Sequence, residues 1–388
     1  MSEVYGLLVI GGGPAGLSAA RAYREVGGVG PVAIIADEGR VPYDRPPLTK
    51  QLLRGEASES DLPLVEERWL VEHRVALVDG RAVALDPHGR EVTLSGGRVL
   101  RYDRCVLATG AEPTRLPLPG SDDPAVRVIR SLDHLRELQA RLQSATAAIV
   151  IGSGFIGCEI AASLTHRGAD VTLISDEPAP NARRLGDGAA QRIAGWLRDT
   201  GVRLLLGAEV DAIRRDGDRL TVDAGSEHAS APLVVMATGV APRGELMAAA
   251  GGHLVGGAIP VDSAMRTEIA GLLAAGDVCL ADNTTAGRAL RVEHWGDALG
   301  QGTVAGRTAA GEITAWSDVP GFWSTIGERT LKYAAWGDGF DETRLSEGPD
   351  GSFTVWYGRD GRVAGVLAHD ADPDYERGRE LIAAGAAW

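Results

Sequence analysis

The sequence predicts an α/β protein in which two similar domains are followed by a smaller α+β domain. Three observations support this architecture. A glycine pattern that follows an apolar strand and opens a helix occurs twice, about 140 residues apart. Each copy is followed by the same succession of elements, ending in an A-T-G turn, and such duplication indicates two related Rossmann-like domains. From Ala315 onward the composition changes, and four of the eight tryptophans precede Trp388 there.

The first glycine pattern, LLVIGGGPAG, follows a strand predicted over Leu7 to Ile10. Two acids stand about twenty residues further on. The glycines and acids are Gly11, Gly13, Gly16, Asp37 and Glu38. In this context the glycines permit a tight turn, the helix N-terminus holds a pyrophosphate, and the acid binds a ribose.

The second pattern, IVIGSGFIGCE, follows a strand predicted over Ala148 to Ile151. The matching residues are Gly152, Gly154, Gly157, Asp176 and Glu177. One such pattern is weak evidence, but two in the same context predict two dinucleotides. In a single chain these are usually a flavin and a nicotinamide.

The other elements are predicted from periodicity and turn residues. VAIIADE is the second strand of the first domain, and Val75 to Val99 alternates in a way that suggests an antiparallel insertion. Arg104 to Pro113 is a buried strand with a Gly/Pro turn, and the proline-rich stretch from Thr114 to Asp123 suits a crossing between domains. Helical periodicity runs from Asp133 to Leu142.

The second domain repeats this plan. ADVTLIS is its second strand, Val202 to Asp223 alternates again, and Leu233 to Pro242 echoes the earlier A-T-G segment. Leu272 to Leu280 follows, and a long helix rich in small residues ends at Gly311. The final stretch has three strand-like runs (TLKYAAW, FTVWYGR and RVAGVLAH) and a closing helix from Asp374.

Composition limits the classes of partner. The formal net charge of −14 argues against nucleic acid. No apolar run approaches the ~18 residues that span a bilayer, and no charged leader precedes the first strand, so we expect a cytoplasmic protein without a membrane partner. The only cysteines, Cys105, Cys158 and Cys279, are isolated, so no disulfide framework or C-x-x-C pair is expected. No metal site is predicted.

Several motifs in this order resemble one family. PYDRPPLTK, GSGFIGCE, AAGDV, VEHW-x-x-A-x-x-QG and FWS with a following LKY resemble the FAD-dependent NADH:ferredoxin reductases of oxygenase systems, which include putidaredoxin, rubredoxin and dioxygenase ferredoxin reductases. The similarity extends from about residue 4 to about residue 385. It implies a glutathione-reductase-like fold. The expected domains are an FAD domain over 1–112 and 239–313, an NAD(H) domain over 113–238, and a C-terminal α+β domain over 314–388.

The resemblance also implies a set of residues that bind FAD. The FAD is expected to be bound without a covalent link. Among them Asp37, with Glu38, binds the adenosine ribose, Asp277 binds the ribityl chain, Val83 makes a backbone contact on the adenine side, and Trp295 lies near the isoalloxazine. The expected FAD residues are Gly11, Gly13, Pro14, Ala15, Gly16, Asp37, Glu38, Arg45, Lys50, Val83, Ala108, Thr109, Gly110, Arg130, Gly276, Asp277, Glu293, His294 and Trp295.

For the nicotinamide coenzyme, Glu159 falls in the first turn of the second helix. There it either complements the helix dipole or, as the resemblance implies, pairs with Lys50 near the flavin. Lys50 and Glu159 are therefore the expected catalytic residues. The expected coenzyme residues are Gly152, Gly154, Phe155, Ile156, Gly157, Glu159, Asp176 and Gly239.

NADH is the expected coenzyme, because Asp176 and Glu177 would repel a 2′-phosphate. NADPH stays as the alternative, since Ser175 stands where NADH-preferring members of the family usually have an acid, and Arg183 and Arg184 follow.

The route by which electrons leave is predicted from missing cysteines. The chain has Pro42 to Arg45 where peroxide and coenzyme-A-disulfide reductases need a cysteine. No thiol is placed to relay electrons. The remaining interpretation, which is the activity of the resembling family, is single-electron delivery from the flavin to a small acidic iron–sulfur ferredoxin. Two alternatives stay open: an apoptosis-inducing-factor-like signalling flavoprotein, or an NADH:quinone or oxygen oxidoreductase. Trp323 and Lys332 are expected at the ferredoxin contact, and the protein is expected to be a monomer or homodimer.

Overall fold

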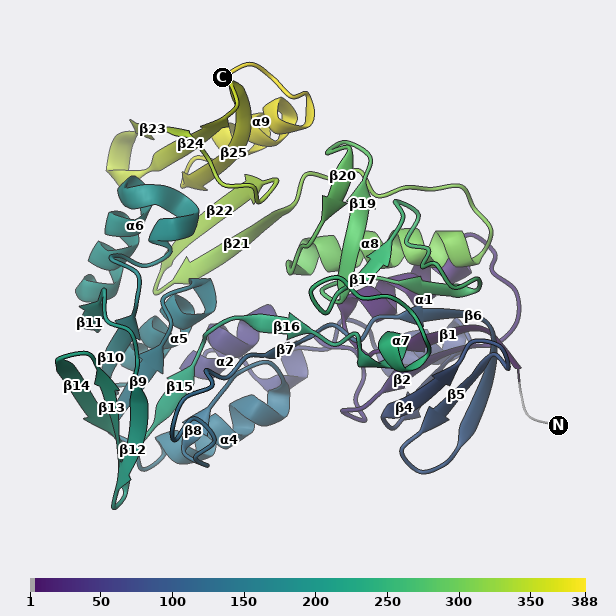
Figure 1. Ribbon diagram of the computed structural model, residues 1–388, viewed down its shortest axis with the longest axis horizontal. Helices are drawn as coiled ribbons and strands as arrows, with labels where there is room; N and C mark the ends of the chain where they lie inside the picture. Colours follow the sequence, from purple (N-terminus) through teal and green to yellow (C-terminus); the bar gives the residue numbers. More distant parts are fainter. Residues whose placement is uncertain (1–3) are drawn as a thin grey trace.

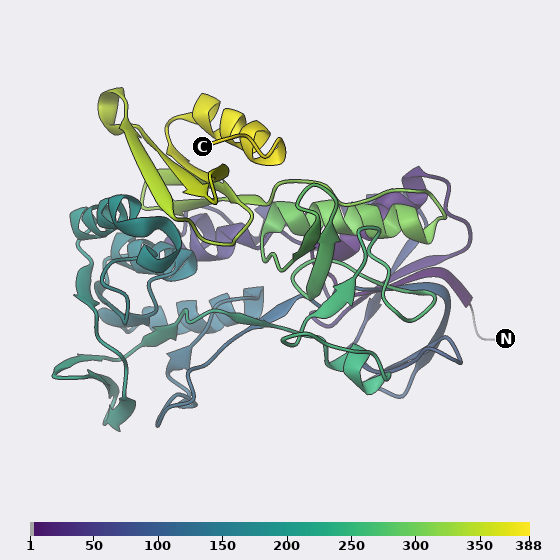
Figure 2. The same ribbon diagram turned by 45° about the horizontal axis from the view of Figure 1, so that its top comes forward.

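The computed structural model describes residues 4–388, so the first three residues of the predicted FAD domain lie outside the described part. Figure 1 shows the first α/β domain on the right, the second on the left, and the C-terminal sheet above the second. The same arrangement is seen from a second direction in Figure 2. The α/β and α+β architecture expected from the sequence is confirmed by these elements.

The first domain is built on a sheet in the order β3-β2-β1-β6-β5-β4, with β18 also paired to β6. Its parallel strands are β1 (Val4–Ile10), β2 (Val32–Ala36), β3 (Val75–Asp79), β6 (Val99–Leu107) and β18 (Leu272–Ala274). Strands β1 and β2 carry nearly continuous apolar runs because both of their faces are covered. Strands β4 (Ala82–Asp86) and β5 (Glu91–Leu94) are antiparallel.

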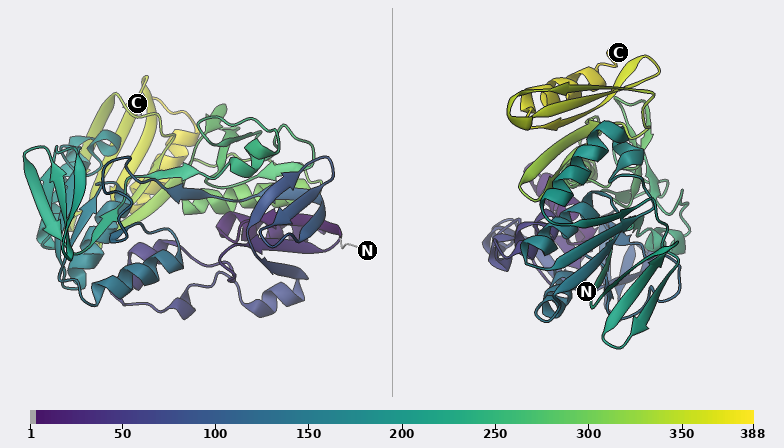
Figure 3. Two further views of the ribbon diagram at one scale, coloured as in Figure 1. Left: turned by 60° about the horizontal axis from the view of Figure 1, so that its bottom comes forward. Right: turned by 90° about the vertical axis from the view of Figure 1, so that its left-hand side faces the viewer.

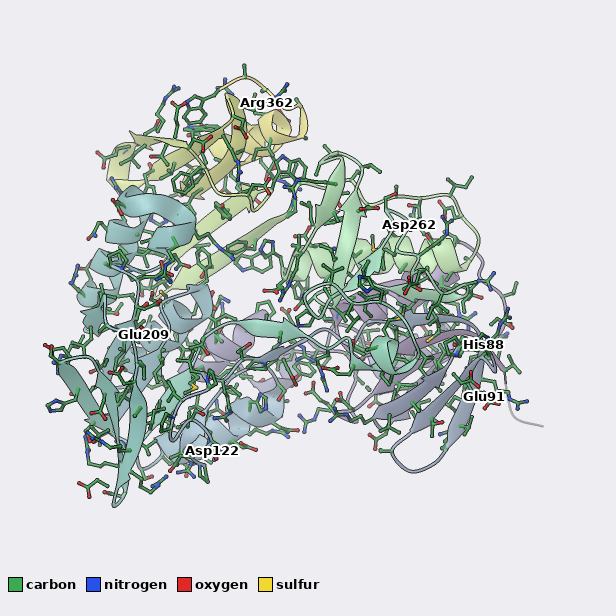
Figure 4. The ribbon with its side chains drawn as sticks, in the orientation of Figure 1. His88, Glu91, Asp122, Glu209, Asp262 and Arg362 are labelled. Carbon is green, nitrogen blue, oxygen red and sulfur yellow. The ribbon has the colours of Figure 1, made fainter. Side chains whose placement is uncertain are left out.

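The predicted antiparallel insertion over residues 75–99 is therefore wrong in its first part. β3 pairs parallel with β2, through Val75 opposite Val32 and Val78 opposite Ile35. As the outermost strand it is only partly covered: Val75 and Val78 are buried, whereas Ala76 and Asp79 are exposed. Because an edge strand of a parallel sheet keeps exposed positions, the sequence alone does not distinguish it from an antiparallel strand. The turn after β4, which contains His88, lies at the outer edge of the molecule (Figure 4).

The second domain repeats the plan with a five-stranded sheet in the order β11-β10-β9-β15-β8. Its parallel strands are β8 (Val126–Arg127), β9 (Ala147–Ile151), β10 (Asp170–Ser175), β11 (Arg203–Leu206) and β15 (Val234–Met236). A three-stranded antiparallel sheet follows β11, made of β12 (Ala212–Asp216), β13 (Arg219–Ala224) and β14 (Glu227–Ala231). A short antiparallel pair, β7 (Ala111–Pro113) with β16 (Val240–Pro242), connects the two domains.

Helices α1 (Pro14–Glu25) and α5 (Phe155–His166) follow the two glycine turns. Helix α8 (Trp295–Ala309) packs against α1 through small residues. A Cβ at Gly302 would lie 2.2 Å from the Ala15 carbonyl oxygen, and one at Gly306 would lie 2.1 Å from that of Ala19. The other helices are α2 (Gln51–Arg54), α3 (Glu67–Glu72), α4 (Leu132–Leu142), α6 (Ala182–Asp199), α7 (Glu245–Ala249) and α9 (Asp372–Ala383).

The C-terminal sheet is antiparallel, in the order β21-β22-β25-β24-β23. Its strands are β21 (Gly321–Ile326), β22 (Arg329–Ala335), β23 (Glu342–Glu347), β24 (Phe353–Arg359) and β25 (Arg362–His369). The sheet lies above helix α6 (Figure 3). Tyr357 donates a hydrogen bond to the carbonyl of Leu185 at 3.0 Å, and Trp196 packs on Phe353 and His369. A small sheet of β17 (Ile259–Val261), β19 (Cys279–Asn283) and β20 (Arg288–Leu290) completes the first domain.

Candidate active site

One large cavity lies between the two glycine turns and reaches strand β21. Its volume is about 1170 Å³, above the ~300–1,000 Å³ usual for a single small-molecule site. Most of the sequence-predicted residues line it, from both α/β domains. They are Gly11, Gly13, Pro14, Ala15, Asp37, Glu38, Arg45, Lys50, Ala108, Thr109, Gly110, Arg130, Gly154, Phe155, Ile156, Glu159, Gly239, Gly276, Asp277, Glu293, His294 and Trp295.

Five predicted residues do not line the cavity: Gly16, Val83, Gly152, Gly157 and Asp176. For the glycines the reason is packing. A Cβ at Gly16 would lie 2.1 Å from the Gly11 carbonyl oxygen, and one at Gly157 would lie 2.0 Å from that of Gly152. These glycines hold each helix close to its turn, which is the role of the third glycine of the fingerprint.

The other glycines fit a dinucleotide cradle. Gly11 has φ +126° and Gly152 has φ +102°, which favour glycine, and a Cβ at either would meet a carbonyl oxygen of the adjacent strand end. Gly13 and Gly154 are the N-cap residues of α1 and α5, and a Cβ there would meet no protein atom within 4 Å. Since both line the cavity, the open space beside each backbone is available to a pyrophosphate at a helix N-terminus.

The acidic residues after β2 have different surroundings. The Glu38 carboxylate accepts hydrogen bonds from the Tyr43 hydroxyl at 2.6 Å and from Arg45 at 2.9 Å. Burial raises the pKa of the Tyr43 phenol, so Tyr43 is a neutral donor. Asp37 lines the cavity and is more open, with the Arg243 guanidinium 3.6 Å away. Glu38 therefore orders Arg45, and Asp37 is the acid with free acceptor capacity for a ribose.

A chain of polar contacts then crosses the cavity wall. Arg45 donates to the carbonyl oxygen of Arg130 at 2.7 Å, and the Arg130 guanidinium forms an ion pair with Asp277. Asp277 is buried just after β18, where Gly276 donates its backbone N–H to Gln301 at 2.9 Å. The predicted residues Arg45, Arg130 and Asp277 are thus assembled from three distant segments of the chain.

Lys50 and Glu159 form the ion pair that the family resemblance implied. The Lys50 Nζ lies 2.8 Å from Glu159 Oε2, and the two side chains are 7% and 5% exposed. Glu159 Oε2 also accepts from the Thr49 hydroxyl at 2.6 Å, and Oε1 accepts from the Ser324 hydroxyl at 2.6 Å. A buried ion pair of this kind is tolerated because hydrogen bonds from Thr49 and Ser324 also satisfy the carboxylate oxygens.

Aromatic side chains close this end of the cavity. Phe322 from β21 contacts Phe155 edge-on, with ring centroids 4.7 Å apart, and the His294 ring at 4.5 Å. Trp295 meets Trp323 edge-on at 5.9 Å, and Trp323 is 42% exposed. Sequence analysis did not assign Phe322 or Thr49 to the site. The two-residue period of a strand could have identified Phe322, because Phe322 and Trp323 must point to opposite faces of β21.

The cavity wall after strand β10 carries both acidic and basic side chains. Asp176 is exposed and does not line the cavity, but it forms a 2.8 Å ion pair with Arg183, which does. Glu177, Arg183 and Arg184 line the cavity, and the Glu177 carboxylate accepts the Arg183 backbone N–H at 2.9 Å. The Ser175 hydroxyl accepts from Ser153 at 2.7 Å beneath them.

The three cysteines lie in the core, where burial raises the pKa of each thiol, so none is a thiolate at neutral pH. Within residues 4–388 there is no group of three or more His, Cys, Asp and Glu side chains that could hold a metal ion. Over the same range, no helix has the length and apolar character needed to cross a membrane.

Comparisons with known proteins agree with this geometry. Residues 5–302 match the family described as pyridine nucleotide-disulphide oxidoreductase, and residues 321–388 match the one described as reductase C-terminal. Rhodocoxin reductase of Rhodococcus erythropolis is 31% identical over 383 residues, which cover 97% of this chain and 89% of that protein.

Two solved structures are similar along nearly the whole chain. The ferredoxin reductase for the CYP199A2 system from Rhodopseudomonas palustris has a TM-score of 0.93 and 29% identity, over 98% of this chain and 95% of its own. The covalent putidaredoxin reductase–putidaredoxin complex has a TM-score of 0.91 and 26% identity, over 98% and 93%. The chain therefore belongs to the pyridine nucleotide-disulphide oxidoreductase family of FAD- and NAD(P)H-dependent enzymes, among its ferredoxin reductases.

Proposed function

We propose that this protein passes electrons from NADH through FAD to a small acidic iron–sulfur ferredoxin that feeds an oxygenase. The observation that carries the proposal is a single cavity that joins both glycine turns and ends at the Lys50–Glu159 pair. Similar proteins include reductases named for rhodocoxin and for putidaredoxin. The two dinucleotides supply the hydride donor and its acceptor when bound, so the chain itself needs no nucleophile or metal.

We assign FAD to the first glycine turn. Gly13 leaves room for the pyrophosphate at the N-terminus of α1, and Asp37 is open to the ribose. Arg130 and Asp277 stand beside each other further along the cavity, where the ribityl chain would lie. Val83 is half exposed on β4 and does not line the cavity, so its adenine-side backbone contact stays a prediction without support from the cavity.

We assign NADH to the second turn, with Gly154 at the pyrophosphate and Phe155 and Glu159 at the nicotinamide end. Lys50 and Glu159 would orient the reacting ring, and the aromatic wall of Phe155, Phe322 and His294 would exclude water. Orientation and exclusion of water are the contributions that a protein makes to hydride transfer.

The exit for electrons is proposed at Trp295 and Trp323, since this aromatic pair runs from the cavity lining to the surface. Lys332 lies directly opposite Trp323 across β21 and β22. Its ammonium forms a 2.6 Å ion pair with Asp372, so the local positive charge is smaller than a free lysine would give. A cationic patch for an acidic partner therefore depends on whether this pair opens during docking.

Turnover with different acceptors tests the proposal. Purified protein reconstituted with FAD should reduce a ferredoxin taken from a P450 or dioxygenase system, with NADH as donor. Its kcat/KM should exceed that for a quinone or for oxygen. Faster turnover with quinone or oxygen would favour a plain NADH oxidoreductase. Slow turnover with all acceptors, together with an NADH-induced change between monomer and dimer in light scattering, would favour a signalling flavoprotein.

A further inference from the structure

Strand β21 of the C-terminal domain places three consecutive side chains in different surroundings. Phe322 contacts Phe155 and His294 at the cavity, Trp323 is 42% exposed, and Ser324 is 1% exposed. This alternation follows from the two-residue period of a strand. The strand therefore meets the solvent with one residue and enters the reaction site with the residues on either side of it.

The hydroxyl of Ser324 donates to Glu159 Oε1 at 2.6 Å. The other oxygen, Oε2, is held by Lys50 at 2.8 Å and by Thr49 at 2.6 Å, both from the first domain. Within residues 4–388, Ser324 is the only side chain that donates to Oε1. The carboxylate is thus fixed from two sides by different domains, and loss of Ser324 would leave it held at one oxygen.

We propose that Ser324 is a positioning residue for flavin reduction, and that the C-terminal domain completes the hydride-transfer site through it. The proposal rests on the proposed function and names a further residue of that same site. Hydrogen bonds to an ionised group are strong and directional. With both oxygens held, the plane of the carboxylate and the position of Lys50 are fixed. Without Ser324, only Oε2 of Glu159 is held, and the carboxylate can rotate about its Cγ–Cδ bond.

The chain offers a matched control for a purely structural role. Thr354, in the same domain, is also 1% exposed, and its hydroxyl donates to the Asp374 carboxylate at 2.7 Å. Neither Thr354 nor Asp374 lines the cavity. Thr354→Val therefore removes a buried hydroxyl bonded to a carboxylate without touching the reaction site, as Ser324→Ala does at the site itself.

The experiment compares Ser324→Ala, Glu159→Gln, the double variant and Thr354→Val, all loaded with FAD. The rate of flavin reduction at saturating NADH is measured by stopped flow, the Kd for NAD⁺ by calorimetry, and the unfolding midpoint by circular dichroism. Ser324→Ala should slow reduction at least tenfold, since misplacement by ~1 Å can cost ~100-fold in rate. Its Kd for NAD⁺ should change less than threefold, and Ser324→Thr should recover most of the rate. Thr354→Val should keep the wild-type rate.

If Ser324 acts through Glu159, the double variant should be no slower than Glu159→Gln. Full additivity of the two rate losses would overturn the proposal. So would a rate in Ser324→Ala within twofold of wild type, or equal losses in Ser324→Ala and Thr354→Val. A weakened Kd with an unchanged rate would mean that Ser324 serves binding instead. Wild-type flavin that NADH does not reduce would overturn the proposed function and this inference together, whereas the other outcomes overturn the inference alone.

Discussion

Replacement of Lys50 by methionine should separate the structural and the chemical parts of the buried ion pair. Methionine keeps the apolar stem and removes the charge. The Glu159 carboxyl is then left at 5% exposure with hydrogen bonds from Thr49 and Ser324 but no cation beside it. Removal of one partner of a buried pair costs about 3–5 kcal/mol. For domains of this size, that corresponds to a fall in the unfolding midpoint on the order of 10 °C.

Flavin reduction by NADH should slow by about 100-fold in Lys50→Met, because the positive group that orients the nicotinamide-facing surface is gone. The double variant Lys50→Met/Glu159→Gln removes both charges. The carboxamide oxygen can accept from one of the Thr49 and Ser324 hydroxyls, and the carboxamide N–H group can donate to the other. The midpoint of this double variant should return to within a few degrees of wild type, while reduction stays slow. Stability and rate should therefore move apart between the two variants.

The assays are thermal unfolding followed by circular dichroism and stopped-flow absorbance of the flavin, with FAD content measured after each purification. FAD content should be unchanged in both variants, since Lys50 is absent from the polar chain of Arg45, Arg130 and Asp277. A reduction rate within twofold of wild type in Lys50→Met, at a lowered midpoint, would show that the pair serves stability alone. The assignment of Lys50 and Glu159 to hydride transfer would then be refuted.

Four further predictions follow from the same structure. The protein should be yellow with one FAD that acid releases, and Gly11→Val should abolish flavin binding because a Cβ there lies 2.1 Å from a carbonyl oxygen; normal flavin in that variant would contradict the assignment. The wild-type protein should have a higher kcat/KM with NADH than with NADPH. Glu177→Ala should bring these two values closer together, because it removes a carboxylate beside two cavity arginines. A higher wild-type kcat/KM with NADPH would contradict the coenzyme assignment. Lys332→Glu should raise the KM for ferredoxin several-fold, and Asp372→Asn should lower it by freeing the lysine, with ferricyanide reduction unchanged in both; parallel losses with ferricyanide would place docking elsewhere. The three cysteines, whose pKa values burial raises, should resist iodoacetamide in the native protein up to about pH 9 and react once it is unfolded; rapid native labelling would disprove their burial.

Much of the cradle could be predicted from the sequence because its causes are local. A turn with φ above +100° between a strand and a helix requires glycine, as at Gly11 and Gly152. A glycine between an apolar strand and a helix can therefore be recognised from the sequence. The repeated strand–glycine–helix order predicts two related domains for the same reason. The element bounds agree closely, as with α4 at Leu132–Leu142 against the predicted 133–142.

Errors arise where a local pattern has two explanations. Strand β3 has both buried and exposed residues, as an antiparallel strand would, because it lies at the edge of a parallel sheet. Asp176 and Glu177 are neighbours in sequence just after β10, yet only Glu177 lines the cavity. Neither outcome can be read from composition or spacing.

The sequence by itself determined the two dinucleotide-binding turns, the family and the absence of a placed thiol, because each depends on short motifs or on residue types that are present or missing. The pairing of Lys50 with Glu159 was implied by the resemblance to that family, and the tertiary structure decided between it and a role at the helix dipole. Only the tertiary structure decided how Glu159 is held and what Lys332 contacts. Ser324 stands 165 positions from Glu159, and Asp372 stands 40 positions from Lys332. Contacts at such separations depend on how whole domains pack against each other, and no periodicity within a single segment carries that information.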